Sequence, residues 1–285
     1  MLYNLAAPAD FLSTWWGLTI FILLDIAVLL LIIAINYKWF FKRALDILFS
    51  AVFLIVFFPF FLIFLIADAI YNKSQNAYPA LFVREYCCGK KGKPVGYTVF
   101  ATARIQHDEN GKLLPESERT TGMGRVLRAC GMKYYPALLS VFAGGLSFVG
   151  PRPMALADAA AAVGEDAQNR FAVRPGLVSS LEMYGGESLT YPDMFEEDTE
   201  YVSRVGLFRD VAYFMSCIAN RIRGEKKRYG ECAEQGYVDW LLKEGEITPD
   251  DVEGYRREGE ERRKASRADA AKRMEEERRD FNMYR

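Results

Sequence analysis

The sequence predicts an α+β membrane protein with an N-terminal transmembrane helix, a second, proline-interrupted membrane segment and an α+β domain in the cytoplasm. The first observation is that the first 71 of the 285 residues contain only seven charged side chains, those of Asp10, Asp25, Lys38, Lys42, Arg43, Asp46 and Asp68. The second is that more than half of positions 243–285 are charged, and the third is a mixed strand and helix pattern between these ends. A net charge of −1 and 51% hydrophobic residues exclude a strongly basic nucleic-acid binder and a disordered chain, so we expect no nucleic-acid partner.

The first apolar run predicts a transmembrane helix over residues 15–37, preceded by a short segment at 1–14. Its length suits a hydrocarbon core of about 30 Å. Trp15 is typical of one interface, and the basic Lys42 and Arg43 that follow the run place the rest of the chain in the cytoplasm. Asp25 lies near its centre. It either is neutral or reaches a local polar group, or it faces another helix of this chain or of a partner.

The second apolar run, residues 47–67, has no charge but is interrupted by Pro59. Proline removes a backbone donor and clashes with the carbonyl four residues earlier, so a helix here kinks or breaks. Two geometries follow from the residues. A kinked span would put the following domain outside the cell, whereas a re-entrant helix would turn at Pro59 and leave the membrane on the side it entered.

The central part of the chain predicts an α+β domain with strands first and helices after them. Alternating residues and turn signals predict two or three strands over 81–114. Helices are expected over 120–139 and 155–172, and an amphipathic helix over 193–223. Beyond it, residues 225–285 form a charged helical extension, which is either a solvated helix or one that binds a partner or anionic lipid.

Several short motifs occur in a fixed order over residues 40–224. They are Lys42-Arg43 with Asp46, Pro59, Gly89–Pro94, Gly122–Arg128, Ser147–Pro153, Val173–Gly176 and the pair Asp198 and Tyr201. The ordered set resembles the monotopic bacterial sugar transferases, which move a sugar phosphate from a nucleotide sugar onto polyprenyl phosphate. The resemblance implies a domain over 42–224 with a re-entrant helix at 44–71 and Lys42, Arg43, Asp46 and Pro59 as its membrane anchor. It also implies a bacterial inner-membrane protein, with the domain on the cytoplasmic face and membrane lipid and polyprenyl phosphate as partners.

The resemblance also locates the position where the catalytic residues of the family stand. Such enzymes use an aspartate nucleophile and an adjacent glutamate that helps hold Mg²⁺, in the stretch L-R-K-T-S-L-D-E-L-P-Q-L. Residues 127–138 of this chain read L-R-A-C-G-M-K-Y-Y-P-A-L, so Lys133 and Tyr134 occupy the two carboxylate positions. Lysine cannot be a carboxylate nucleophile and repels Mg²⁺, and a protonated tyrosine is a poor ligand for it. We therefore expect no catalytic dyad, no metal site and no cofactor.

Retained backbone motifs without the carboxylate pair indicate a catalytically inactive member of the family. It would act as a regulatory or structural partner of an active homologue, as a hetero- or homo-oligomer, in glycoconjugate or polysaccharide assembly. An alternative keeps phosphoglycosyl transfer and Mg²⁺ but recruits another carboxylate, Glu182 or Glu187. A third is a membrane scaffold unrelated to sugars.

The candidate phosphate-binding residues are Arg125, Arg128, Arg152 and Arg174. For Arg152 and Arg174 the interpretation as phosphate or headgroup ligands stands beside one in which they only support turns. Lys133 either pairs with an anionic headgroup or acidic neighbour, or is a surface residue without a role. The single histidine, His107, and the five cysteines form no zinc-binding pattern.

Overall fold

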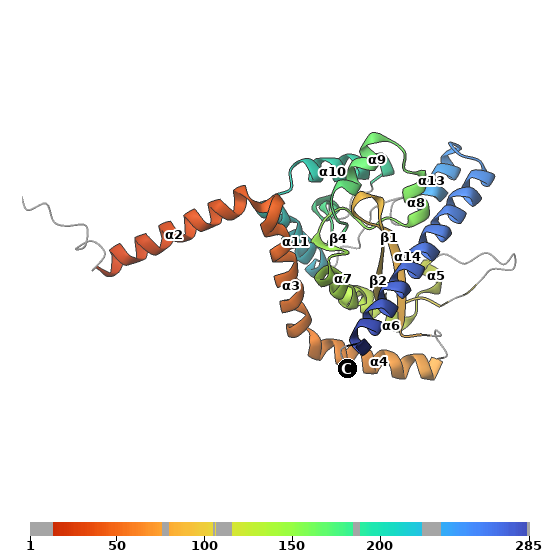
Figure 1. The fold of residues 1–285 in the computed structure, drawn as a ribbon, viewed down its shortest axis with the longest axis horizontal. Helices are drawn as coiled ribbons and strands as arrows, with labels where there is room; N and C mark the ends of the chain where they lie inside the picture. Colours follow the sequence, from red (N-terminus) through yellow and green to blue (C-terminus); the bar gives the residue numbers. More distant parts are fainter. Residues whose placement is uncertain are drawn as a thin grey trace, which may run out of the picture.

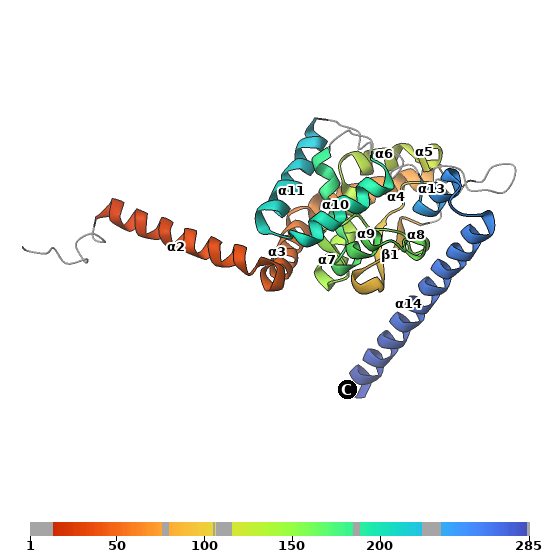
Figure 2. The same ribbon diagram turned by 90° about the horizontal axis from the view of Figure 1, so that it is seen from above.

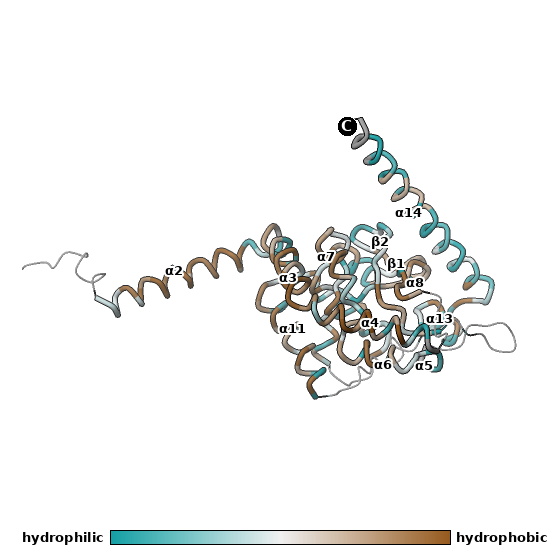
Figure 3. Tube along the Cα trace, turned by 90° about the horizontal axis from the view of Figure 1, so that it is seen from below, coloured by the Kyte–Doolittle hydropathy of each residue, from teal (hydrophilic) through white to brown (hydrophobic). Residues whose placement is uncertain are grey.

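The computed structural model describes residues 14–75, 80–104, 106, 116–184, 189–223 and 235–283. Helix α2, Trp15–Ile35, begins at Thr14, whose hydroxyl accepts a hydrogen bond from the amide of Gly17. It projects from the domain as an isolated rod (Figure 1) and is coloured as hydrophobic over almost its whole length (Figure 3). Within the described residues it is the one unbroken helix long and apolar enough to cross a membrane.

The second apolar run forms two helices joined by a sharp bend. A short π-helix, Tyr37–Phe41, leads into α3, Lys42–Val56, and α4 covers Phe58–Gln75. The two helices differ in direction by 59°. Pro59 is the second residue of α4, a position where its missing N–H leaves no helical hydrogen bond unmade. The expectation of a break near Pro59 is therefore confirmed, and the pair is either a broken span or a re-entrant segment by its geometry alone.

Two small sheets follow α4. Strands β1, Phe82–Cys88, and β2, Pro94–Phe100, form an antiparallel hairpin in which Phe82 lies opposite Phe100 and Cys88 opposite Pro94. The turn between them has positive φ at Lys91 and Gly92. Strands β3, Ser147–Val149, and β4, Gly176–Val178, pair in parallel. The described residues thus contain more helix than strand, with both present as predicted for an α+β domain.

The remaining elements are mostly short helices. They are a 3₁₀ helix Lys90–Gly92, α5 Glu116–Arg119, α6 Gly122–Ala129, a 3₁₀ helix Met132–Ala137, α7 Leu138–Ala143, α8 Leu156–Ala161, α9 Glu165–Asn169, a 3₁₀ helix Arg170–Ala172, a 3₁₀ helix Ser180–Tyr184, α10 Tyr191–Ser203, α11 Leu207–Ile222, α13 Tyr237–Glu244 and α14 Pro249–Met283. Each of the three long helices predicted from the central region is therefore divided. Gly131 takes a φ of 79° after α6, and Gly206 is extended between α10 and α11, so neither continues a helix.

Several clusters of buried apolar residues hold the described part of the domain together, and two of them connect α4 and the C-terminal helices to the rest. One lies between α4 and the hairpin, where Phe61 stacks on Tyr135 at 4.8 Å and contacts Phe100 at 5.6 Å. The other joins α8 and α10 to the C-terminal helices through buried residues such as Trp240 and Val252. Seen from above, α14 starts against the domain beside α13 and then diverges from it (Figure 2).

Candidate functional site

Lys42 fixes the start of α3 to the end of the domain. Its ammonium lies 2.6 Å from the Asp210 carboxylate and donates to the carbonyl of Val149 at 2.9 Å. The Tyr201 hydroxyl donates to the same carboxylate at 2.9 Å. Burial and the nearby Asp210 charge keep the Tyr201 pKa well above its usual range, so this hydroxyl remains a donor. The cluster connects α3, β3, α10 and α11 at one point.

Arg43 and Asp46 continue this connection along α3. Arg43 donates to the carbonyls of Val141 and Phe142 at 2.7 and 2.8 Å. The Asp46 carboxylate accepts from the Ser147 hydroxyl at 2.8 Å and from the Phe148 amide at 2.9 Å. All three charged residues of the predicted membrane anchor thus bind the segment 141–149, which leads into the G-P-R-P turn.

A buried ion pair supports that turn from the other side. Arg170 lies 3.0 Å from Asp198, with side chains that are 2% and 0% exposed, and donates to the carbonyl of Arg152 at 2.6 Å. Burial raises the Asp198 pKa to about 6, while the Arg170 charge opposes that rise. Asp198 therefore acts through Arg170 on the backbone that presents Arg152.

These contacts position one wall of a cavity of about 1320 Å³. Its other walls come from the hairpin, α6, the 3₁₀ helix Met132–Ala137, the start of α8 and α14. Its basic side chains are those of Arg84, Arg125, Arg128, Lys133, Arg152, Arg221, Arg256 and Arg263. The carboxylates in its wall, Glu85, Glu182 and Glu260, are fewer, so the cavity has an excess of positive charge.

Lys133 lies in this wall and is only 7% exposed. Its ammonium is 3.4 Å from Glu85 of β1 and 5.1 Å from the centre of the Tyr134 ring. The Tyr97 hydroxyl donates to the other oxygen of Glu85 at 2.9 Å, and burial raises the Tyr97 pKa above its usual range. The sequence predicts that Lys133 either pairs with an anionic headgroup or acidic neighbour, or is a surface residue without a role. The structure shows an acidic neighbour, Glu85, and a buried Lys133 side chain. An ammonium and a phenol therefore stand where the resemblance places the carboxylate dyad.

Arg128 is held by the segment that follows β2. Its guanidinium donates twice to the Thr102 hydroxyl, at 2.9 and 2.7 Å. Gly124 allows this approach, because a Cβ there would lie 2.1 Å from the Thr102 carbonyl oxygen. Arg221 of α11 donates to the carbonyls of Arg128 and Ala129 at 3.2 and 3.1 Å. The G-x-G-R-x-L-R motif thus serves backbone packing and presents cations to the cavity.

Five of the predicted phosphate-binding or dyad positions lie in the wall of this cavity, and one predicted phosphate ligand lies outside it. Arg128, Arg152, Lys133 and Tyr134 line the wall together with the exposed Arg125. Arg174 is not part of the wall, and its Nε donates to the Gly144 carbonyl at 2.8 Å.

Sequence reasoning missed several cavity residues. Glu85 and Arg84 carried no motif, and Arg221, Arg256 and Arg263 lie in helices whose register against the cavity no local pattern reveals. Glu182, a candidate replacement carboxylate, is 2% exposed and lines the wall. Glu187, His107 and Cys232 lie outside the described residues.

The donor set does not fit the Mg²⁺ ion that the resemblance implies. Among the residues that the structure describes, no three His, Cys, Asp or Glu side chains lie close enough to share a metal ion. At the dyad position the ammonium of Lys133 repels a divalent cation, and Mg²⁺ prefers oxygen ligands in octahedral geometry. The wall around this position carries positive charge from Lys133, Arg128 and Arg152.

The fold and the cavity define a class, an α+β domain with a basic pocket that follows an apolar helix long enough to cross a membrane. The chain belongs to the bacterial sugar transferase family, whose profile matches residues 37–224. This family membership confirms the resemblance noted in the sequence.

Individual relatives agree with the family assignment. The chain is 34% identical over 131 residues to the "Uncharacterized sugar transferase EpsL" of Bacillus subtilis, covering 46% of this chain and 64% of that protein. It is 33% identical over 179 residues to the UDP-glucose:undecaprenyl-phosphate glucose-1-phosphate transferase of Caulobacter vibrioides, covering 60% and 65%. The enzyme of the same name from Escherichia coli is 30% identical over 181 residues, covering 60% and 38%. The chain thus spans less than two thirds of each of these relatives.

Proposed function

We propose that this chain is a catalytically inactive sugar transferase that binds a nucleoside diphosphate and acts as a regulatory or structural partner in membrane polysaccharide assembly. One observation carries the proposal. Buried Lys133, paired with the partly exposed Glu85, stands in the wall of a basic cavity at the position where the resemblance places the family's carboxylate dyad. A lysine engaged in this way offers no carboxylate for attack on a sugar phosphate, but its charge favours an anionic ligand.

The ligand class follows from the charge and size of the cavity. Guanidinium groups match phosphate oxygens bidentately, and the cavity is lined by Arg125 and Arg128 of α6 and by Arg152 of the G-P-R-P turn. Its volume of about 1320 Å³ exceeds the roughly 300–1,000 Å³ common for small-molecule pockets, which leaves room for a nucleotide with a sugar. A UDP-sugar is the natural probe, because two of the relatives are named for UDP-glucose.

A re-entrant membrane segment is part of the proposal, and the contacts at both ends of the bend support it. The start of α3 is bound to the domain through Lys42, Arg43 and Asp46. The far helix, α4, packs on the same domain through Phe61, and the Tyr135 hydroxyl donates to the carbonyl of Leu54 just before the bend. A helix pair that crossed the bilayer completely would have to separate from these partners on one side.

An exposed apolar surface beside the bend further supports membrane contact. On α3 and α4, Ile55, Ile63 and Ile70 are 74%, 63% and 65% exposed. On α11, Phe208 and Ile222 are 72% and 81% exposed. The two regions adjoin, since Phe53 of α3 contacts Phe214 of α11 at 6.0 Å, and Figure 3 shows hydrophobic residues over α3, α4 and α11. An exposed apolar area of this size is unfavourable in water, whereas contact with lipid removes that cost.

We place the domain at the cytoplasmic face of the bacterial inner membrane, with polyprenyl phosphate as its lipid ligand. The topology is tested with an epitope tag after Arg285 in protoplasts or spheroplasts. We expect antibody binding only after permeabilisation. Binding to intact protoplasts or spheroplasts would place the domain outside and would favour the kinked span.

Catalytic inactivity is tested by nucleotide release. The purified full-length chain in nanodiscs is incubated with Mg²⁺, undecaprenyl phosphate and a panel of nucleotide sugars, beside the Caulobacter relative with UDP-glucose as a positive control. We expect no nucleoside monophosphate above background from this chain. Turnover that is lost in a point variant of this chain would contradict the proposal. Co-purification with an active sugar transferase from the native membrane would identify the partner.

A second candidate function, phosphoglycosyl transfer with a non-standard nucleophile, rests on Glu182. This carboxylate is almost completely buried in the cavity wall, and Asn220 donates to its backbone carbonyl at 2.7 Å. Under this alternative Mg²⁺ would be required, and Glu182→Gln would abolish turnover while Glu165→Gln, an exposed residue outside the cavity, would not. The same assay therefore decides between the two candidates.

A further inference from the structure

The C-terminal helices α13 and α14 lie outside the region matched by the family, yet they form part of the folded domain. Val238 and Trp240 of α13 and Val252 of α14 are buried in the core shared with α8 and α10. The Asp158 carboxylate accepts the amide of Val238 at 3.0 Å. This hydrogen bond and the shared core fix the extension to α8, which differs from the solvated helix expected from the charge of the segment alone.

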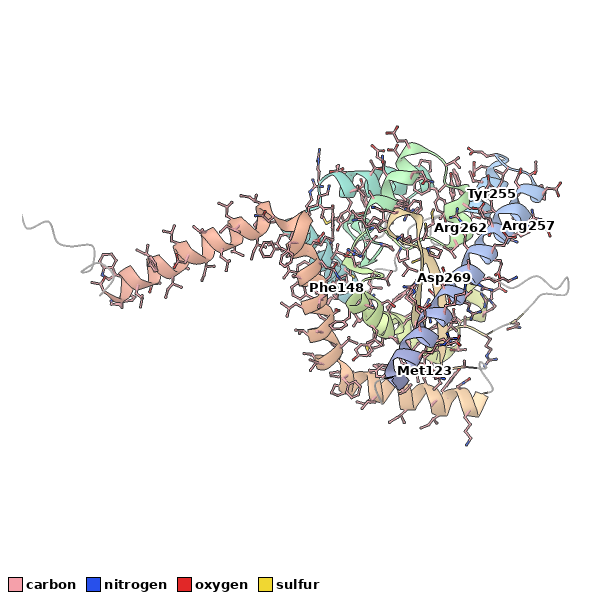
Figure 4. The ribbon with its side chains drawn as sticks, viewed as in Figure 1. Met123, Phe148, Tyr255, Arg257, Arg262 and Asp269 are labelled. Carbon is pink, nitrogen blue, oxygen red and sulfur yellow. The ribbon has the colours of Figure 1, made fainter. Side chains whose placement is uncertain are left out.

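Gly259 sets how closely α14 approaches α8. A Cβ at this position would lie 2.8 Å from the backbone nitrogen of Ala157, which cannot move aside as a flexible side chain could. Glycine therefore allows the two helix backbones to approach closely next to the cavity. Figure 4 shows Tyr255, Arg257, Arg262 and Asp269 in order along α14 as the helix passes the hairpin.

This approach makes α14 one wall of the basic cavity. Arg256, Gly259, Glu260 and Arg263 line it, together with Arg152 and the hairpin residues of the family domain. Without α14 the cavity would be open along this side and would lose two of its guanidinium groups. The extension thus changes both the enclosure and the charge of the site.

Both arginines are held by carboxylates of the extension itself. Arg256 lies 2.6 Å from Asp239, and Arg263 lies 2.7 Å from Glu260. Their side chains are 56% and 42% exposed, and ion pairs at such exposed positions contribute little free energy. A phosphate group, with more charge and a bidentate fit, can therefore replace the carboxylates at small cost.

We propose that α14 completes the ligand site, with Arg256 and Arg263 binding the phosphates of a nucleoside diphosphate that the family domain holds from the opposite side. This inference rests on the proposed function, because it takes a nucleoside diphosphate as the ligand. Binding and docking of the helix are then coupled, so the ligand also holds α14 against the domain.

The test is isothermal titration of UDP and of pyrophosphate into the full-length chain in nanodiscs. The variant Arg256→Gln with Arg263→Gln is compared with a control of equal charge change on the same helix, Arg257→Gln with Arg273→Gln. The control arginines are exposed and do not line the cavity. We expect the first variant to bind both ligands roughly ten- to a hundredfold more weakly, and the control to change less than about threefold.

The outcomes separate this inference from the proposed function. No binding of UDP or pyrophosphate by the unmodified chain overturns both. Binding by the unmodified chain that is equally strong in the Arg256 and Arg263 variant overturns the role of α14 alone. An equal loss in the control variant also overturns it, since long-range charge would then explain the effect. Weaker binding of UDP without weaker binding of pyrophosphate would contradict the assignment of the arginines to phosphates.

Discussion

Breaking the Lys133–Glu85 pair is expected to destabilise the domain, because Lys133 is almost completely buried. Two unit charges at 3.4 Å attract by about 5 kcal/mol at an effective dielectric constant near 20. Desolvation of Lys133 and the 35% exposure of the Glu85 side chain reduce this gain. We therefore expect a coupling free energy of about 1–3 kcal/mol, between the values typical of exposed and buried pairs.

The assay is a double-mutant cycle with Lys133→Met, Glu85→Gln and the double variant, followed by thermal unfolding in detergent. At about 2–4 °C per kcal/mol for a domain of this size, a cost near 2 kcal/mol lowers the Tm of Lys133→Met by about 4–8 °C. The control is Arg279→Met, which removes an exposed pair with Glu275 whose side chains are 73% and 65% exposed. We expect that variant to change the Tm by less than about 2 °C.

The cycle is informative because it isolates the interaction between the two side chains. If the two single changes add to the double change within about 0.5 kcal/mol, the side chains do not interact. Lys133 would then be a residue without a structural role, and the argument that an internal ion pair has replaced the dyad would be refuted.

Further predictions concern the metal, the C-terminal helix, the buried thiol and the dyad position. UDP affinity should change less than about twofold when EDTA replaces Mg²⁺, because cationic side chains supply the charge; a loss of binding in EDTA would show that a metal is required. Gly259→Val should displace α14 from Ala157 and speed trypsin cleavage within α14, whereas Gly254→Val, whose Cβ would meet nothing within 4 Å, should not; equal cleavage rates would contradict the close approach. Burial raises the Cys87 pKa from 9.0 to about 12, so the folded state retains the proton and Cys87 favours folding below pH 9, with that contribution lost as pH rises towards 12. Iodoacetamide at pH 8 should accordingly label the exposed Cys130 and leave Cys87 unmodified until the protein unfolds, as read by peptide mass spectrometry; early labelling of Cys87 would contradict its burial. Lys133→Asp with Tyr134→Glu should not start nucleotide release, because Glu85 would then face a second carboxylate; turnover in this variant would show that the rest of the site is intact.

The apolar helices and the family framework could be predicted because their signals are local. The uncharged run at 47–67 and its proline predicted a break, and the structure bends by 59° there. Lys42, Arg43 and Asp46 were recognised as a unit, but their partners in segment 141–149 are distant in sequence. No pattern in the residues themselves indicates those pairings.

The site could be predicted only in part, because the cavity is built from elements that meet through long-range packing. Arg128 and Arg152 were found from motifs that also shape the backbone. The V-R-P-G motif predicts the same role for Arg174, yet its guanidinium donates to the Gly144 carbonyl outside the cavity. Glu85 pairs with Lys133 although the two residues are 48 positions apart in the sequence. The charge of α14 predicts a solvated helix or one that binds a partner or anionic lipid. Its docking depends on Gly259 and Val252, two residues whose role is visible only beside Ala157 and the core.

The most direct test of the central claim, that the chain has no nucleophile for a sugar phosphate, is the intact mass of the protein after exposure to a nucleotide sugar. The full-length chain is incubated with Mg²⁺ and each UDP-sugar in the absence of lipid acceptor, and then denatured rapidly. We expect an unchanged mass, beside a control in which UDP is shown to bind. A mass increase equal to one phosphosugar, mapped to a carboxylate such as Glu85 or Glu182, would contradict the account.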